Sequence, residues 1–95
     1  MTNNPPMMFP EKLDGADVLY YTEKGDYGTV NDTNGKICDY VSYFAVCSYS
    51  SDKNKYYLFL CDECFDVITD WFCDSVEECM QIASNHSREI VWHKC

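Results

Sequence analysis

Two kinds of residue in this chain have types and spacings that could support chemistry: cysteines near histidines, and carboxylates that lie close together. Cys61-Asp-Glu-Cys64 is a CxxC motif on an expected hairpin turn, a geometry that suits a zinc knuckle. Tetrahedral zinc needs four ligands, and no second CxxC is present. Further ligands would have to come from Cys73, Cys79, His86, His93 and Cys95. We therefore expect no metal and no other cofactor, and keep as an alternative a small zinc-binding module that uses Cys61 and Cys64.

The pattern of nucleophiles and bases does not indicate an enzyme. His86 and His93 both lie near the C-terminal end, and no orienting motif accompanies them to activate a cysteine. Asp66 and Asp70 are expected on a solvated strand face, which does not prepare carboxylates for acid–base catalysis. The four glycines form no phosphate-binding loop. We expect a protein that binds rather than catalyses.

The strongest signal in the sequence is acidic. Between residues 56 and 87 there is no lysine or arginine, and there are seven carboxylates: Asp62, Glu63, Asp66, Asp70, Asp74, Glu77 and Glu78. The last three lie where a helix is expected to begin, and the helix dipole favours anions there. The other four, Asp62, Glu63, Asp66 and Asp70, are predicted to form the charged centre of a surface that binds a basic protein. Neighbouring tyrosines would supply apolar anchors.

Composition limits the function classes further. A net charge of −9 repels nucleic acid and anionic membranes, and steers basic proteins inward. Acidity that serves solubility alone remains an alternative. The absence of a signal-like segment or a long apolar run predicts a cytoplasmic protein, in which the seven cysteines are free thiols. The 95 residues predict a single domain over residues 1–95, with an irregular N-terminal arm over 1–12 that packs its apolar residues onto the body.

Hydrophobic patterning predicts mostly strands. Val18–Thr22 and Tyr27–Val30 are expected to form a hairpin, and residues 37–49 a long central strand. Residues 56–61 form a second central strand. Phe65 to Phe72 should alternate, with Phe65, Val67, Thr69 and Trp71 on one face and Asp66, Ile68 and Asp70 on the other.

One helix is predicted in the C-terminal half of the chain. Ser75 and Glu78 form a capping box, in which the glutamate is expected to accept from the Ser75 amide. The apolar stripe of the helix is Val76, Cys79, Met80 and Ala83. Asn85 is expected to end the helix, and residues 89–93 to form a last strand. The fold class is α+β: an antiparallel sheet of five to six strands with the helix packed on one face.

The segment Tyr56–Asp62, followed by Val67–Asp70 and Asp74–Glu78, resembles a strand–turn–strand–capped-helix pattern of small acidic bacterial immunity proteins of polymorphic toxin systems. The resemblance covers residues 56–84. It implies a single-domain inhibitor that binds a toxin domain and blocks its active site. Because an acidic surface could occupy the site of nucleic-acid phosphates, we expect the toxin to be of the nuclease type. A phage- or plasmid-encoded inhibitor that mimics nucleic acid is an alternative, because it would use the same acidic surface. A homodimer formed through an uncovered edge strand also remains open.

Overall fold

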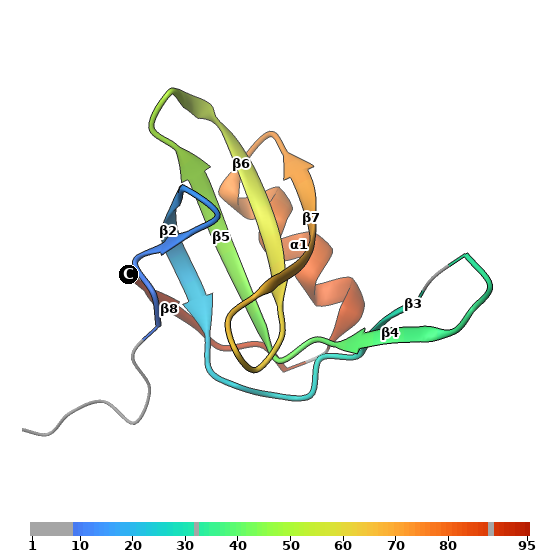
Figure 1. Ribbon diagram of the computed structural model, residues 1–95. Helices are drawn as coiled ribbons and strands as arrows, with labels where there is room; N and C mark the ends of the chain where they lie inside the picture. Colours follow the sequence, from blue (N-terminus) through green and yellow to red (C-terminus); the bar gives the residue numbers. More distant parts are fainter. Residues whose placement is uncertain (1–8, 32, 88) are drawn as a thin grey trace, which may run out of the picture.

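The computed structural model describes residues 9–31, 33–87 and 89–95, and shows an antiparallel sheet with one helix (Figure 1). The predicted α+β fold class is therefore confirmed. Six strands form one sheet in the order β1-β2-β5-β6-β7, with β8 also paired to β2, and the sheet curves into a half-barrel. The remaining two strands form a separate ribbon, β3–β4. The elements are β1 (Lys12–Leu13), β2 (Ala16–Thr22), β3 (Thr29–Asn31), β4 (Ile37–Tyr40), β5 (Tyr43–Tyr49), β6 (Asp52–Cys61), β7 (Val67–Cys73), α1 (Val76–His86) and β8 (Trp92–Lys94).

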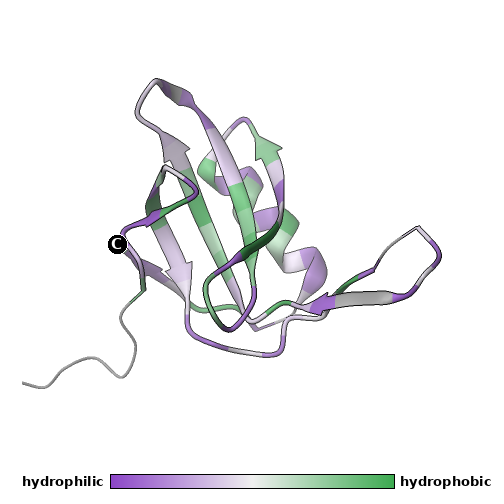
Figure 2. Cartoon of the chain, in the orientation of Figure 1, coloured by the Kyte–Doolittle hydropathy of each residue, from purple (hydrophilic) through white to green (hydrophobic). Residues whose placement is uncertain are grey.

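Strands β5 and β6 lie in the middle of the sheet, as predicted, because both of their faces are apolar. One face forms the helix-side core around Phe44, Val46, Leu58 and Leu60, together with Cys79 and Ala83 of α1. The opposite face forms the arm-side core around Tyr43, Ala45, Cys47, Phe59 and Cys61, together with Leu13, Ala16 and Val18. Figure 2 shows hydrophobic stretches in the central strands and on α1. The sheet is thus covered on one face by the helix and on the other by the N-terminal part of the described chain.

Helix α1 begins where the capping box predicts. The Ser75 hydroxyl accepts from the Glu78 amide at 3.0 Å. The carboxylate of Glu78 accepts from the Asp74 amide at 2.8 Å, one residue earlier than the predicted Ser75 amide. The helix extends to His86 rather than ending at Asn85, and the Ser87 amide caps it by donating to the Ala83 carbonyl at 3.2 Å. Buried Cys79 and Ala83 confirm the predicted apolar stripe.

The predicted strand over residues 37–49 is wrong as a single element. The chain leaves the β3–β4 ribbon after Tyr40 and enters the main sheet at Tyr43. The predicted hairpin of Val18–Thr22 with Tyr27–Val30 is also wrong: β2 pairs with β1, β5 and β8, whereas β3 pairs with β4. Both segments favour strand locally, but their partners are set by contacts distant in sequence.

A β-bulge in β7 changes the predicted alternation of its side chains. Thr69 lies opposite Leu60, and Val67 lies opposite Cys61, so Ile68 is an extra residue. As a result Val67 packs on the arm-side core, whereas Ile68 packs on the helix-side core and Trp71 contacts His86 of α1 with ring centroids 6.4 Å apart. The predicted grouping of Phe65, Val67, Thr69 and Trp71 on one face is therefore wrong.

The N-terminal part of the described chain is more regular than predicted. Leu13 and Ala16 are paired across Asp14-Gly15, whose positive φ values of 49° and 82° suit a two-residue hairpin turn. Before this hairpin, the Phe9 ring stacks on Tyr21 at 4.8 Å between centroids. Packing of the arm on the body is thus confirmed at Phe9. Residues 1–8, which hold the other apolar residues predicted to pack there, lie outside the described residues.

The described chain folds compactly, with a Cα radius of gyration of 13.3 Å. Its one helix, α1, spans 11 residues, and no described helix has the length and apolar character that a membrane crossing requires.

Candidate functional site

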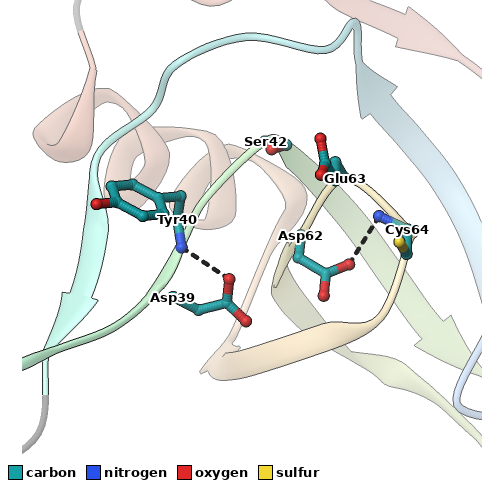
Figure 3. A pocket seen from close by; sticks show the side chains of 6 residues that line it. All are labelled: Asp39, Tyr40, Ser42, Asp62, Glu63 and Cys64. Carbon is teal, nitrogen blue, oxygen red and sulfur yellow. Dashed lines mark hydrogen bonds between the residues drawn. The ribbon is translucent and has the colours of Figure 1, made fainter.

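The acidic residues of the β6–β7 turn line a hollow of about 370 Å³. One wall is the turn that joins β6 to β7, and the other is the segment that leaves the β3–β4 ribbon (Figure 3). The lining residues are Asp39, Tyr40, Ser42, Asp62, Glu63 and Cys64. We call this set the acidic hollow. It brings three carboxylates, a phenol, a hydroxyl and a thiol together on the surface.

A backbone hydrogen bond at Ser42 joins the two walls, and further bonds at Val41 position the segment that carries Asp39 and Tyr40. The Ser42 amide donates to the carbonyl of Cys61, the last residue of β6, at 2.8 Å. The Val41 amide donates to the Gly28 carbonyl at 2.9 Å, and the Tyr27 amide donates to the Val41 carbonyl at 3.1 Å. The Val41 side chain is buried in the helix-side core. These bonds fix where the ribbon leaves the sheet, and therefore how Asp39 and Tyr40 lie relative to the turn.

Asp62 organises the β6–β7 turn itself. One of its carboxylate oxygens accepts from the amides of Cys64, at 2.8 Å, and Asp66, at 3.0 Å. The Asp62 amide donates to the Asp66 carbonyl at 3.0 Å, which closes the hairpin. A carboxylate that accepts from amides two and four residues ahead stabilises a tight turn. Asp62 therefore has a structural role in addition to its charge.

Phe65 completes this turn in an unusual backbone conformation. Its φ of 66° lies in the left-handed region, where glycine is the usual residue in a three-residue hairpin loop. The Phe65 ring stacks on Tyr43, with centroids 4.6 Å apart, and meets the edge of Phe9 at 5.2 Å. Packing of this ring against the arm-side core offsets the backbone strain and anchors the turn to the sheet.

The charges in and around the acidic hollow are unbalanced. Lys24 approaches Glu63 at 3.3 Å from the rim, and both side chains are largely exposed, so this pair contributes little. The Asp39 carboxylate accepts from the Tyr40 amide at 2.9 Å. The Tyr40 side chain is 61% exposed, which makes it one of the most exposed large aromatics in the described chain. The hollow thus offers negative charge suited to cationic side chains, and the exposed Tyr40 ring extends from its rim away from Asp62 and Glu63 (Figure 3).

The structure brings together some of the four acidic residues that the sequence singled out. Asp62 and Glu63 line the hollow, and exposed Asp66 belongs to the same turn. Asp70 lies farther along β7, opposite Phe59, and does not line the hollow. Three of the four residues, Asp62, Glu63 and Asp66, therefore cluster at the turn, and Asp70 lies apart from them on β7.

Sequence reasoning missed Asp39 and Tyr40. Residues 37–49 looked like one central strand, and in such a strand the Asp39 carboxylate would be buried without a partner. That conflict was the available signal, because an aspartate inside an apolar strand is more often a strand end or a break. In the structure Asp39 is only partly buried and lies in the ribbon, four residues before the chain enters the main sheet at Tyr43.

The two cysteines of the CxxC motif lie in different environments. Cys61 is fully buried in the arm-side core, and burial raises the pKa of its thiol to about 12. Cys64 is exposed at the hollow. Across the described residues, no three histidine, cysteine, aspartate or glutamate side chains form a group that could hold a metal ion.

The remaining cysteines that the sequence offered as ligands are also dispersed. Cys73 and Cys79 are buried where β7 meets α1, in the helix-side core, and burial raises the pKa of both thiols. His93 lies 3.1 Å from the Glu23 carboxylate, and Cys95 is exposed. The buried thiols are neutral at ordinary pH and act as small apolar side chains.

Searches against protein-family models, curated proteins and solved structures each find no significant match to this chain. Its own geometry and charge are therefore the basis for any functional assignment.

Proposed function

We propose that this protein is a protein-binding inhibitor of the immunity-protein type, which neutralises a basic toxin domain in the cytoplasm. The toxin would be of the nuclease type, because such a domain presents cationic side chains to phosphates and these can bind carboxylates instead. The observation that carries the proposal is the acidic hollow, where Asp39, Asp62 and Glu63 surround a surface beside exposed Tyr40.

Long-range and short-range electrostatics would have different roles in this binding. The net charge of −9 accelerates encounter with a basic protein, and the effect weakens as salt is added. The hollow supplies the short-range part, because lysine or arginine side chains can enter it and meet several carboxylates. Tyr40 adds apolar contact area at the rim of the hollow, as interface tyrosines do.

The test begins with a pull-down from cells of the source organism at low salt, followed by elution at high salt. A basic protein released by salt is then purified, and its affinity is measured for three forms: wild type, Glu63→Gln, and Glu77→Gln as a matched control. The control removes the same charge from the first turn of α1 and leaves the hollow intact. We expect Glu63→Gln to weaken binding about five- to tenfold and to reduce its salt dependence, and the control to change affinity less than twofold.

Equal effects of the two substitutions would show that general charge, and not the hollow, drives binding. Recovery of no basic partner would reject the inhibitor function. A zinc assay on the same purified protein addresses the alternative module built on Cys61 and Cys64, which predicts about one zinc per chain. A nucleic-acid mimic differs from an immunity protein only in its partner, which the pull-down would identify.

A further inference from the structure

We propose that the open edge of β7 binds an extended segment of a basic protein, which adds a strand to the sheet. This inference rests on the proposed function for the basic character of the partner. It concerns a different part of the surface from the acidic hollow, and a different kind of contact, since main-chain hydrogen bonds would carry it.

Strand β7 is the last strand of the sheet on its side. It pairs with β6 from Val67 to Cys73, and along its other edge no strand pairs with it in the described part of the chain. Figure 1 shows β7 at the margin of the sheet, with α1 behind it. Alternate residues of such an edge present unpaired N–H and C=O groups, which can pair with another strand.

Two adjacent large aromatics are exposed on this edge strand. Trp71 is 47% exposed and Phe72 is 53% exposed. They lie on opposite faces, because Trp71 is paired with Leu58 of the helix-side core and Phe72 with Tyr57 on the arm side. A strand added beside β7 would therefore cover apolar surface on both faces of the sheet at once.

Charge decides which strand would bind there. Asp66, Asp70 and Asp74 recur at intervals of four residues along and beside β7. Antiparallel pairing of two copies centred on Asp70 would place Asp70 opposite Asp70 and Asp66 opposite Asp74. Like charges directly opposite one another destabilise a strand pair, and each copy carries a net charge of −9. A basic segment meets the same positions with favourable pairs.

The Phe72 ring, two residues after Asp70, already lies beside a cation. The Lys55 ammonium lies 5.9 Å from the centre of the Phe72 ring. Asp70 and Phe72 share the arm-side face, since their partners Phe59 and Tyr57 lie on that face. An alternating segment with lysine or arginine toward this face and apolar residues toward Trp71 would match both sides of β7.

The probe is an eight-residue peptide of alternating lysine and valine, with blocked ends. Two further versions carry N-methyl groups on either the lysine or the valine amides. Because only alternate amides of a bound strand face β7, we expect one methylated version to bind about tenfold or more weakly than the parent, and the other to bind within about threefold of it. Affinity is measured by titration calorimetry at low salt, and amide hydrogen exchange should become slower at alternate residues of β7.

Two protein variants complete the test. Asp70→Asn is expected to weaken the parent peptide about threefold or more, and the matched control Glu77→Gln less than twofold. A peptide of alternating glutamate and valine should not bind. Equal affinity of both methylated peptides, with binding of the parent intact, would overturn strand addition and leave the acidic-surface function standing. A dimer of the free protein that shields the β7 amides would also overturn the inference, by assigning the edge to a second copy.

Discussion

Substitutions at Asp62 separate its structural role from its charge. One oxygen of its carboxylate accepts two amides, at 2.8 and 3.0 Å, and these bonds shape the β6–β7 turn. Alanine removes both bonds, whereas asparagine keeps a carbonyl oxygen at the same place and loses only the charge. Each bond contributes roughly 0.5–1.5 kcal/mol, and water can reach the exposed turn and compensate part of the loss. We expect Asp62→Ala to lower the free energy of unfolding by about 1–2 kcal/mol, and Asp62→Asn by less than about 0.5 kcal/mol.

The assay is urea unfolding followed by the fluorescence of Trp71 and Trp92. For a domain of this size, the alanine variant should also melt roughly 4–16 °C lower than wild type. Equal destabilisation by alanine and asparagine would refute the reasoning, because it would mean that charge rather than hydrogen-bond acceptance holds the turn. An alanine variant as stable as wild type would show that the Phe65 ring alone anchors the turn. Against the basic partner, both variants should bind more weakly than wild type, because both lose the charge.

Three further predictions concern the fold. The buried Thr22 hydroxyl accepts from the Phe44 amide at 3.0 Å, and valine would leave that amide without this partner. Thr22→Val should therefore lower the free energy of unfolding by about 1–3 kcal/mol, and Thr22→Ser should lower it by less. Urea unfolding measures both. Gly25→Ala should cost about 1–3 kcal/mol, since a Cβ there would lie 2.7 Å from the buried Tyr27 ring, and this cost should shrink in a Tyr27→Ala background. Burial raises the pKa of the Cys61 thiol from 9.0 to about 12. Between these two pH values the folded protein keeps the thiol proton and the unfolded chain loses it. The contribution of Cys61 to the free energy of unfolding is therefore full below pH 9 and falls by about 1.4 kcal/mol per pH unit above it. When urea unfolding is measured from pH 8 to 10.5, the free energy of unfolding of Cys61→Ala should fall less steeply with pH than that of wild type. The same steepness in both proteins would contradict the assigned burial of Cys61.

Local signals predicted α1 better than they predicted strand pairing. The cap at Ser75 and the buried positions Cys79 and Ala83 depend on residues within two turns of one another, so the sequence contains what fixes them. The division between β4 and β5 depends instead on bonds from Val41 to Gly28 and from Ser42 to Cys61. No local preference separates the two strands, because both are rich in residues that favour extended structure.

The same distinction applies to the acidic hollow. Asp62 and Glu63 were found because they are adjacent in an acidic stretch, and their place in a turn follows from the two strands on either side. Asp39 arrives from another part of the chain and could not be placed beside them without knowing the path at Val41 and Ser42. The bulge at Ile68 likewise decides which face Asp70 occupies, and a single extra residue leaves no mark in the hydrophobic pattern.

The position of Phe9 links the start of the described chain to the acidic turn. Its ring lies between Tyr21 of β2 and Phe65, so a residue far away in sequence supports the loop that carries Asp62 and Glu63. Shortening the chain at this end would remove that support without touching a charged residue. A truncation that removes residues up to Phe9 would therefore weaken binding although no residue of the acidic hollow had been removed.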